Sequence, residues 1–257
     1  MISPFFSAVL LTCLLGSSAF AFKVGVTAGP HAMIIQQVKE KAAKKGLNLD
    51  IQIVEFNDFI LPNEALNEGE LDANSYQHQP FLDEQSKLKG YQLTSVAKTV
   101  LMPMGLYSDK LKGLSEMKEG AKIAIPNDPT NGGRALKLLE ANGFLKLKPD
   151  VALPSLLDIT DNPKKLKIIE LEAPQLPRCL PDVDAAVINT DWILLAGMDP
   201  KTALAVESED SPYTNIIVVQ TAKKDDKDVK EFVDLYQSKE IKDYIDKEFK
   251  GAVLVAW

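Results

Sequence analysis

From Phe22 onward the sequence alternates between short apolar strands and amphipathic helices. FKVGVTAG predicts a strand that runs into a glycine turn, and LDIQIVEF predicts the next strand. The apolar residues of the helix between them recur at helical spacing: Met33, Ile34, Val38 and Ala42. LPNEALNEG then predicts a short helix that ends before Gly69. This β-α-β-α order requires crossover connections, so it predicts an α/β sheet covered by helices.

A second series of the same kind occupies the middle of the chain. LTSVAKTVLMPMGLYS is too long for one ordinary strand and is interrupted by Pro103, so we expect it to lead from one lobe to another. AKIAIPN, LKIIELE and DAAVINTDW predict strands of the second lobe, and NIIVVQT predicts the strand on which the chain returns. We therefore expect lobe I to comprise residues 22–102 and 218–257, lobe II to comprise residues 103–217, and two crossing strands to join them.

Polar and aromatic side chains recur at the predicted strand ends. Ligands of open α/β sheets bind beyond the carboxyl ends of the strands, so a cleft between the lobes is the expected site. Each of these residues, taken singly, also fits an ordinary turn. The candidates are Phe59, Tyr76, His78, Asn189 and Asn215.

Arg134, one of only two arginines, stands in NDPTNGGRALKLL, just inside the start of a predicted helix. A helix N-terminus is already partly positive, so an arginine in the first turn predicts a bound anion. The two glycines before it would let the backbone approach that anion. Together with the strand-end residues, this pattern indicates a site for a small apolar amino acid: a guanidinium for the carboxylate, amide oxygens for the ammonium and aromatic rings for the side chain.

Charge and composition exclude several classes of function. The net charge of -7 argues against nucleic acid or an anionic membrane surface as a partner. The sequence has no GxSxG, GxxxxGK[ST] or HExxH motif. Its only histidines are His78 and His31, and we expect His31 to be a helix cap or a surface residue. We therefore expect no metal, no cofactor and no catalytic residues; an enzyme with His78 as general base is the alternative.

Residues 1–21 form an uncharged apolar run that ends in Ala19-Phe20-Ala21, which is typical of a secretory signal peptide. Cleavage after Ala21 predicts a periplasmic protein. Cys13 is the alternative processing site, where lipidation would tether the protein to a membrane. The residues before Cys13, Leu11 and Thr12, fit a lipidation motif poorly, so cleavage after Ala21 is favoured.

Six blocks of the sequence resemble, in order, the motifs of the MetQ/NlpA family, the methionine-binding components of bacterial ABC importers. They are EFNDFILPNEAL, GELDANSYQHQPFLDEQ, IPNDPTNGGRALKLLE, IIELEAPQLPR, AAVINT and DSPYTNIIVV. The resemblance spans essentially the whole mature chain. It implies a two-lobed periplasmic binding protein of the type II-like class, monomeric and non-catalytic. Such a receptor binds L-methionine, with D-methionine as a further ligand, and delivers it to a separate permease and ATPase in the inner membrane.

The resemblance also implies roles for the candidate residues. Arg134 would hold the methionine carboxylate with Asn189 close to it, and Asn215 would lie near the amino group. Three further residues would line the thioether pocket: Phe59, Tyr76 and His78. The family commonly has tyrosine and phenylalanine at the positions of Phe59 and Tyr76, so one hydroxyl has changed sides. The alternatives are a receptor of the same fold for another small amino acid or an anion, and a surface adhesin or antigen.

Overall fold

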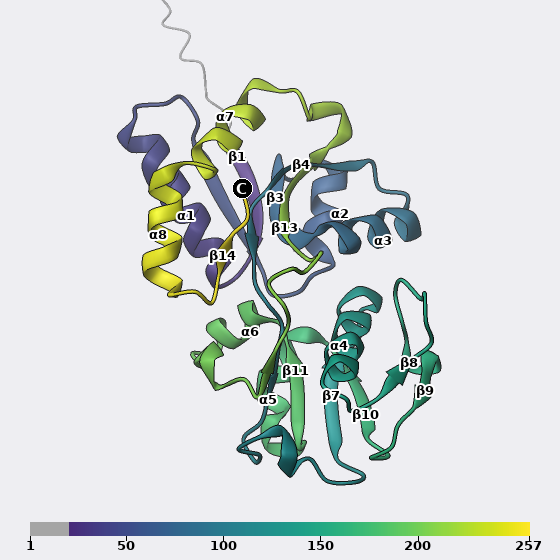
Figure 1. Ribbon diagram of the computed structural model, residues 1–257. Helices are drawn as coiled ribbons and strands as arrows, with labels where there is room; N and C mark the ends of the chain where they lie inside the picture. The colour runs from purple at the N-terminus through teal and green to yellow at the C-terminus, as the bar shows by residue number, and fades with distance from the viewer. Residues whose placement is uncertain (1–20) are drawn as a thin grey trace, which may run out of the picture.

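A computed structural model describes residues 21–257 of the chain, and its first apolar stretches form the predicted sheet (Figure 1). The strand order is β2-β1-β3-β13-β4. Strand β1 is parallel to both of its neighbours, whereas β13 is antiparallel to both of its own. The strands are β1 (Phe22–Thr27), β2 (Ile51–Phe56), β3 (Ala73–His78), β4 (Leu93–Lys98) and β13 (Asn215–Gln220).

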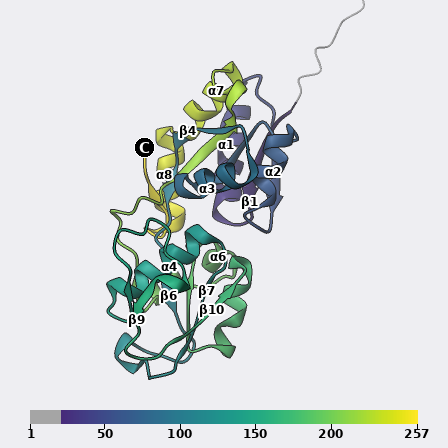
Figure 2. The same ribbon diagram turned by 90° about the vertical axis from the view of Figure 1, so that its right-hand side faces the viewer.

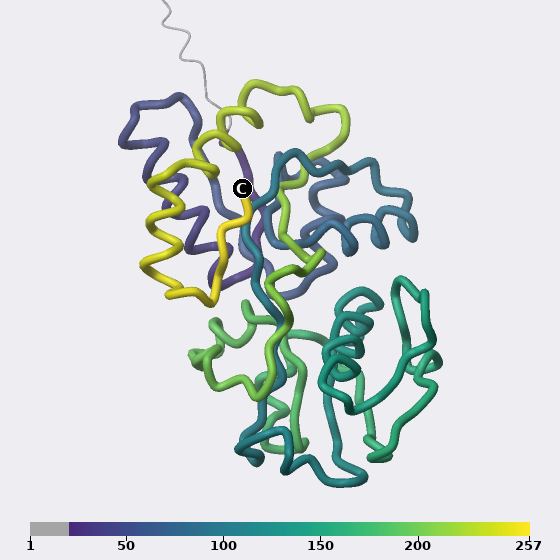
Figure 3. The backbone as a smooth tube through the Cα atoms, in the orientation of Figure 1, coloured from purple at the N-terminus to yellow at the C-terminus, as the bar shows by residue number. Residues whose placement is uncertain are grey.

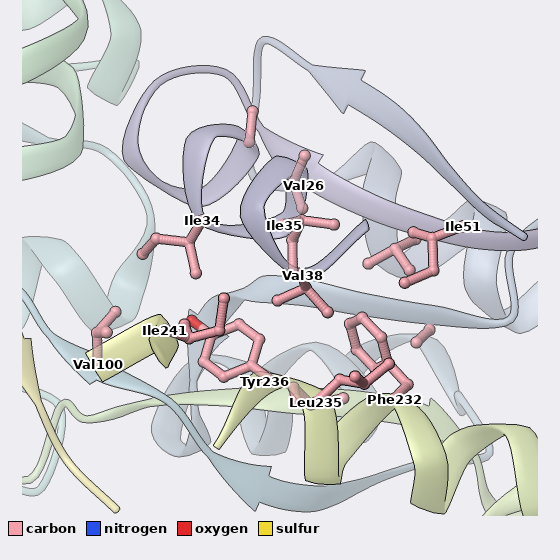
Figure 4. Packing of buried hydrophobic residues seen from close by; sticks show 14 of the residues in the cluster. Val26, Ile34, Ile35, Val38, Ile51, Val100, Phe232, Leu235, Tyr236 and Ile241 are labelled. Carbon is pink, nitrogen blue, oxygen red and sulfur yellow. The ribbon is translucent and has the colours of Figure 1, made fainter. Parts of the chain in front are cut away.

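Helices cover both faces of this first sheet. Three pack on one face: α1 (Pro30–Lys44), α7 (Lys227–Tyr236) and α8 (Lys239–Phe249). Two pack on the other: α2 (Leu61–Glu68) and α3 (Gln79–Lys89). Figure 4 shows Ile35 and Val38 of α1 facing Phe232 of α7 across the core. Met33 departs from the predicted apolar face, because its side chain is 39% exposed while Ile34 is fully buried.

The second sheet has the order β10-β7-β11-β6-β12. Its strands are β6 (Gly105–Tyr107), β7 (Lys122–Pro126), β10 (Lys167–Leu171), β11 (Ala185–Ile188) and β12 (Ala205–Val206). Helix α4 (Pro129–Ala141) packs on one face, and α5 (Leu176–Cys179) and α6 (Thr190–Leu195) pack on the other. Each sheet thus has its own core, which confirms the predicted two-lobed α/β fold.

Short elements complete the two lobes. Two strand pairs form outside the main sheets: β5 (Val100–Leu101) with β14 (Leu254–Val255), and β8 (Lys146–Leu147) with β9 (Ile159–Asp161). Single 3-10 turns form at η1 (Leu114–Glu116), η2 (Leu156–Asp158), η3 (Ala173–Gln175), η4 (Leu180–Asp182), η5 (Pro200–Thr202) and η6 (Thr221–Lys223).

Two segments cross between the lobes, and they lie side by side (Figure 3). The outgoing segment contains Met104 and the returning segment contains Glu207, whose backbone N–H donates to the Met104 carbonyl at 2.9 Å. Strand β13 belongs to the first sheet over its whole length. The prediction that this strand is itself the return crossing was therefore wrong, and the boundary expected after residue 217 moves to before Asn215.

The lobes lie one above the other, with α4 and α6 at the end of the second lobe that faces the first (Figures 1 and 2). Within residues 21–257, no helix is both long enough and apolar enough to cross a bilayer. Apart from Ala21, the predicted signal peptide and the alternative lipidation site at Cys13 fall outside the residues that the structure describes.

Candidate functional site

All six residues selected from the sequence line one pocket between the lobes. Strand β3 and the turn before α2 supply the residues from the first lobe, and the starts of α4 and α6 supply those from the second. The first residue of β13 completes the set. These lining residues are Phe59, Tyr76, His78, Arg134, Asn189 and Asn215.

An aromatic wall joins the two lobes at one side of the pocket. The Phe59 ring lies 5.4 Å from the Trp192 ring of the second lobe and 6.2 Å from the Tyr76 ring of its own lobe, measured between centroids. The Tyr76 hydroxyl donates to the backbone carbonyl of Phe59 at 2.8 Å. The hydroxyl that distinguishes Tyr76 from phenylalanine therefore has a partner within the protein, and the wall remains apolar.

His78 links the lobes through hydrogen bonds. It is the N-cap of α3, and its Nδ1 accepts from the Phe81 backbone N–H at 3.1 Å. The neutral ring therefore carries its proton on Nε2, which donates to Asn131 Oδ1 of the second lobe at 3.2 Å. Asn189 Nδ2 donates to the same Asn131 oxygen at 3.0 Å. Burial lowers the pKa of His78 to about 3, so the ring stays neutral.

Asn215 is oriented by the other histidine. Its Nδ2, which can only donate, lies 3.1 Å from His31 Nε2, so that ring nitrogen is the acceptor. This arrangement leaves Asn215 Oδ1 for the pocket. The expectation that His31 is a cap or surface residue was wrong: Gly29 is the N-cap of α1, and His31 is 1% exposed.

Arg134 already has an anionic partner inside the protein. Its Nε donates to both carboxylate oxygens of Glu207 at 2.9 and 3.0 Å, and its Nη2 donates to Glu207 and to the Met102 carbonyl. Nη1 forms no hydrogen bond within residues 21–257, so it is the nitrogen left for a ligand. The guanidinium also lies 4.5 Å from the centre of the Tyr213 ring.

Arg134 and the two glycines before it differ from the sequence expectation in two respects. Helix α4 begins at Pro129, so Arg134 is in the second turn, where the helix dipole has less effect. The need for an anion comes from burial instead, because the side chain is 4% exposed. The glycines serve packing within the protein: a Cβ on Gly132 would lie 2.9 Å from the Pro126 carbonyl oxygen, and one on Gly133 would lie 2.9 Å from the Pro154 carbonyl oxygen.

Three charged or titratable residues of the site were not among the candidates. Glu207 stands in the acidic run ESED, and His31 follows the glycine turn after β1. In both contexts a solvent-exposed side chain is as common as one in a binding site. Asp191 gave the clearest signal, because it lies two residues after Asn189 at the same strand end. It lines the pocket and is 5% exposed, and burial raises its pKa from 3.8 to about 7.

The pocket is narrow in this conformation. A cavity of about 30 Å³ remains between its walls. A larger groove of about 800 Å³ lies beside Met33 of α1, Leu194 of α6 and Phe249 of α8. It contains none of the six candidates.

Comparison with known proteins agrees with this geometry. The sequence profile of the NlpA lipoprotein family matches residues 22–257. The D-methionine-binding lipoprotein MetQ of Salmonella typhi is 49% identical over 239 residues, which cover 91% of this chain and 88% of that protein. Outer membrane lipoprotein 3 of Mannheimia haemolytica is 44% identical over 254 residues, which cover 98% of this chain and 95% of that protein.

Solved structures give the same result in three dimensions. A nutrient-binding protein from Burkholderia cenocepacia, bound to methionine, superimposes with a TM-score of 0.90 at 48% identity. The superposition covers 92% of this chain and 100% of that one. Because the sequence profile, the pairwise identities and the fold agree over nearly all of the described residues, this chain belongs to the NlpA lipoprotein family.

Proposed function

We propose that this chain is a non-catalytic receptor that binds methionine outside the cytoplasm and delivers it to an ABC importer. The observation that supports this most is the meeting of all six candidate residues in one pocket between two lobes. The methionine-binding relatives support the choice of ligand. The permease and its ATPase would be separate chains in the inner membrane, and the receptor would act as a monomer.

In this proposal a different set of pocket residues binds each chemical group of the ligand. Arg134 Nη1 would donate to the methionine carboxylate, assisted by the second N–H of Asn189 Nδ2. Asn215 Oδ1 would accept from the ammonium. The thioether would lie against the rings of Phe59, Tyr76 and His78, where sulfur–aromatic contacts contribute about 0.3–1.5 kcal/mol. The name of the Salmonella relative supports testing both enantiomers.

We also infer where the receptor is located and how it closes around its ligand. The apolar run before Ala21 supports export across the inner membrane, and the family supports a lipid tether as the alternative to a soluble periplasmic form. Closure would follow from differential binding, because a ligand that touches both lobes only in the closed form shifts the population toward that form.

The enzyme alternative, with His78 as general base, has little support from the geometry. Both ring nitrogens of His78 already take part in hydrogen bonds, and a pKa of about 3 makes the ring a weak base at neutral pH. An inorganic anion as the ligand is also less favoured, since Glu207 already pairs with Arg134 and the aromatic wall would have no role.

Native mass spectrometry followed by calorimetry tests the proposal. Freshly purified protein should carry methionine, and protein that is unfolded, freed of ligand and refolded should bind L- and D-methionine at one site per chain. A panel of other amino acids provides the comparison. Much tighter binding of a different amino acid, or turnover of any of them, would contradict the assignment.

A further inference from the structure

Asp191 is a buried carboxylic acid in the pocket wall that none of the roles above uses. It is the second residue of α6, and its Oδ1 accepts from the Trp192 backbone N–H at 2.9 Å. Its Oδ2 forms no hydrogen bond within residues 21–257. The side chain is 5% exposed and belongs to the pocket lining, so Oδ2 is an acceptor within the pocket lining that the described residues do not use.

Asp191 forms no salt bridge within residues 21–257, and the positive charge of Arg134 offsets only part of the effect of burial on its pKa. Arg134 is the only permanent cation among the residues that line the pocket in the described chain. Two nitrogens of Arg134, Nε and Nη2, already donate to Glu207. His78 is neutral, and burial keeps His31 neutral as well, with a pKa lowered to about 3. An ionised carboxylate in such a place is costly unless a positive charge arrives with the ligand.

Two amide oxygens supply the rest of an ammonium site. Asn189 Oδ1 is enclosed and has no hydrogen-bond partner within residues 21–257, because Asn189 Nδ2 is the atom that bonds to Asn131. Asn215 Oδ1 likewise forms no hydrogen bond within the described residues, and Nδ2 of the same amide donates to His31. An ammonium group donates three hydrogen bonds, and these three residues of the pocket lining offer one acceptor each, with the carboxylate on Asp191.

We propose that Asp191 determines specificity by accepting a charge-assisted hydrogen bond from the α-ammonium of the ligand. The inference rests on the proposed function and adds a counter-ion for the amino group to it. It gives a role to a buried carboxyl group in the lining of a pocket whose arginine is already paired with Glu207. The raised pKa of Asp191, about 7, means that an arriving ammonium needs to displace the proton from only part of the population at neutral pH.

The test compares methionine with its des-amino analogue, 4-methylthiobutanoate, in the wild-type protein and in Asp191→Asn. The substitution keeps the shape of the side chain and an oxygen for the Trp192 N–H, but it removes the charge. Both ligands are titrated calorimetrically into refolded, ligand-free protein. Asp182→Asn is the matched control, because it removes the same charge from an exposed position in η4.

We expect Asp191→Asn to weaken methionine binding by about 10- to 100-fold, the range for a hydrogen bond to a charged group. Binding of the analogue, which has no ammonium, should change by less than about threefold, and Asp182→Asn should alter neither. An equal loss for both ligands would overturn the inference, because Asp191 would then act only on pocket structure. Unchanged methionine binding would also overturn it.

Failure of the proposed function would look different. Wild-type protein that binds neither ligand removes methionine as the substrate before any variant is measured. Thermal melting of the ligand-free variants shows whether each is folded. Because Asp191→Asn removes a buried charge, its melting temperature at pH 8 should be at least that of the wild type; a clear drop would assign Asp191 a structural role and overturn the inference.

Discussion

At the residue scale, the site depends on which atoms of each polar side chain the protein has already used. Arg134 donates to Glu207 through Nε and Nη2, which leaves Nη1 for a ligand. Asn215 donates to His31 through Nδ2, which leaves Oδ1 for a ligand. Each internal bond fixes the direction in which the remaining donor or acceptor points. The side chains of the site therefore lose little conformational entropy when the ligand binds.

Arg134→Lys tests whether the planar guanidinium is required. The guanidinium has three nitrogens, of which two bond to Glu207 and the third is left for a ligand, whereas a lysine ammonium has only one. We therefore expect methionine affinity to fall about 10- to 100-fold in calorimetric titration. Arg178→Lys makes the same chemical change outside the pocket and should leave affinity unaltered. Equal affinities for the two variants would remove Arg134 from the binding site.

Asp191 should make the stability of the ligand-free protein depend on pH. Its pKa is about 7 in the folded state and 3.8 ordinarily, so the folded state binds more protons between these values. The wild type therefore loses stability relative to Asp191→Asn as pH rises from 4 to 7, and the loss is complete above pH 7. We expect the variant to be more stable by on the order of 4 kcal/mol at pH 8 and equally stable near pH 3.5, as measured by denaturant unfolding. A constant difference at both pH values would contradict this.

At the element scale, the start of α4 is held by close backbone contacts that only glycine permits. Proline and aspartate in NDPTN set the N-terminus: Pro129 is the first residue, and the Asp128 side chain caps the Asn131 N–H at 2.9 Å. The helix then passes Pro126 and Pro154 at distances that leave no room for a Cβ. This contact aims Arg134 and Asn131 at the pocket.

Gly133→Ala should disturb that contact. Its Cβ would lie 2.9 Å from the Pro154 carbonyl oxygen, so the helix or the loop has to shift. We expect a loss of about 1–3 kcal/mol in the free energy of unfolding, as for other overpacked sites. Gly113→Ala is the control, because Gly113 has an extended φ of -170° and no atom within 4 Å of the place that an added Cβ would occupy. Similar stabilities for the two variants would show that α4 adjusts freely.

At the scale of the whole molecule, the lobes meet through Phe59 with Trp192 and through His78 with Asn131. The outgoing and returning segments run side by side between them. The C-terminal strand β14 pairs with β5, which directly precedes the outgoing segment. A change in the angle between the lobes therefore alters the aromatic wall directly. The two tryptophans report on different places, since Trp257 packs on Tyr236 in the first lobe.

Tryptophan fluorescence measures this closure. In Trp257→Phe, the remaining Trp192 should shift to shorter emission wavelength when methionine is added to ligand-free protein, because closure buries it against Phe59. Trp192→Phe leaves Trp257 as the reporter and should show no shift. A methionine-dependent shift in both variants, or in neither, would contradict lobe closure at this contact.

The order of amino acids was enough to predict the two-lobed α/β fold and the six residues that meet in the pocket. The spacing of apolar residues predicts which face of a helix or strand is buried, and the carboxyl ends of the predicted strands indicate where a ligand binds. The pairing of Glu207 with Arg134, the orientation of Asn215 by His31 and the burial of Asp191 beside them emerged only from the folded chain. Those pairings join residues far apart in the sequence, and an exposed acid and a buried one look alike until the packing around them removes water from one of the two.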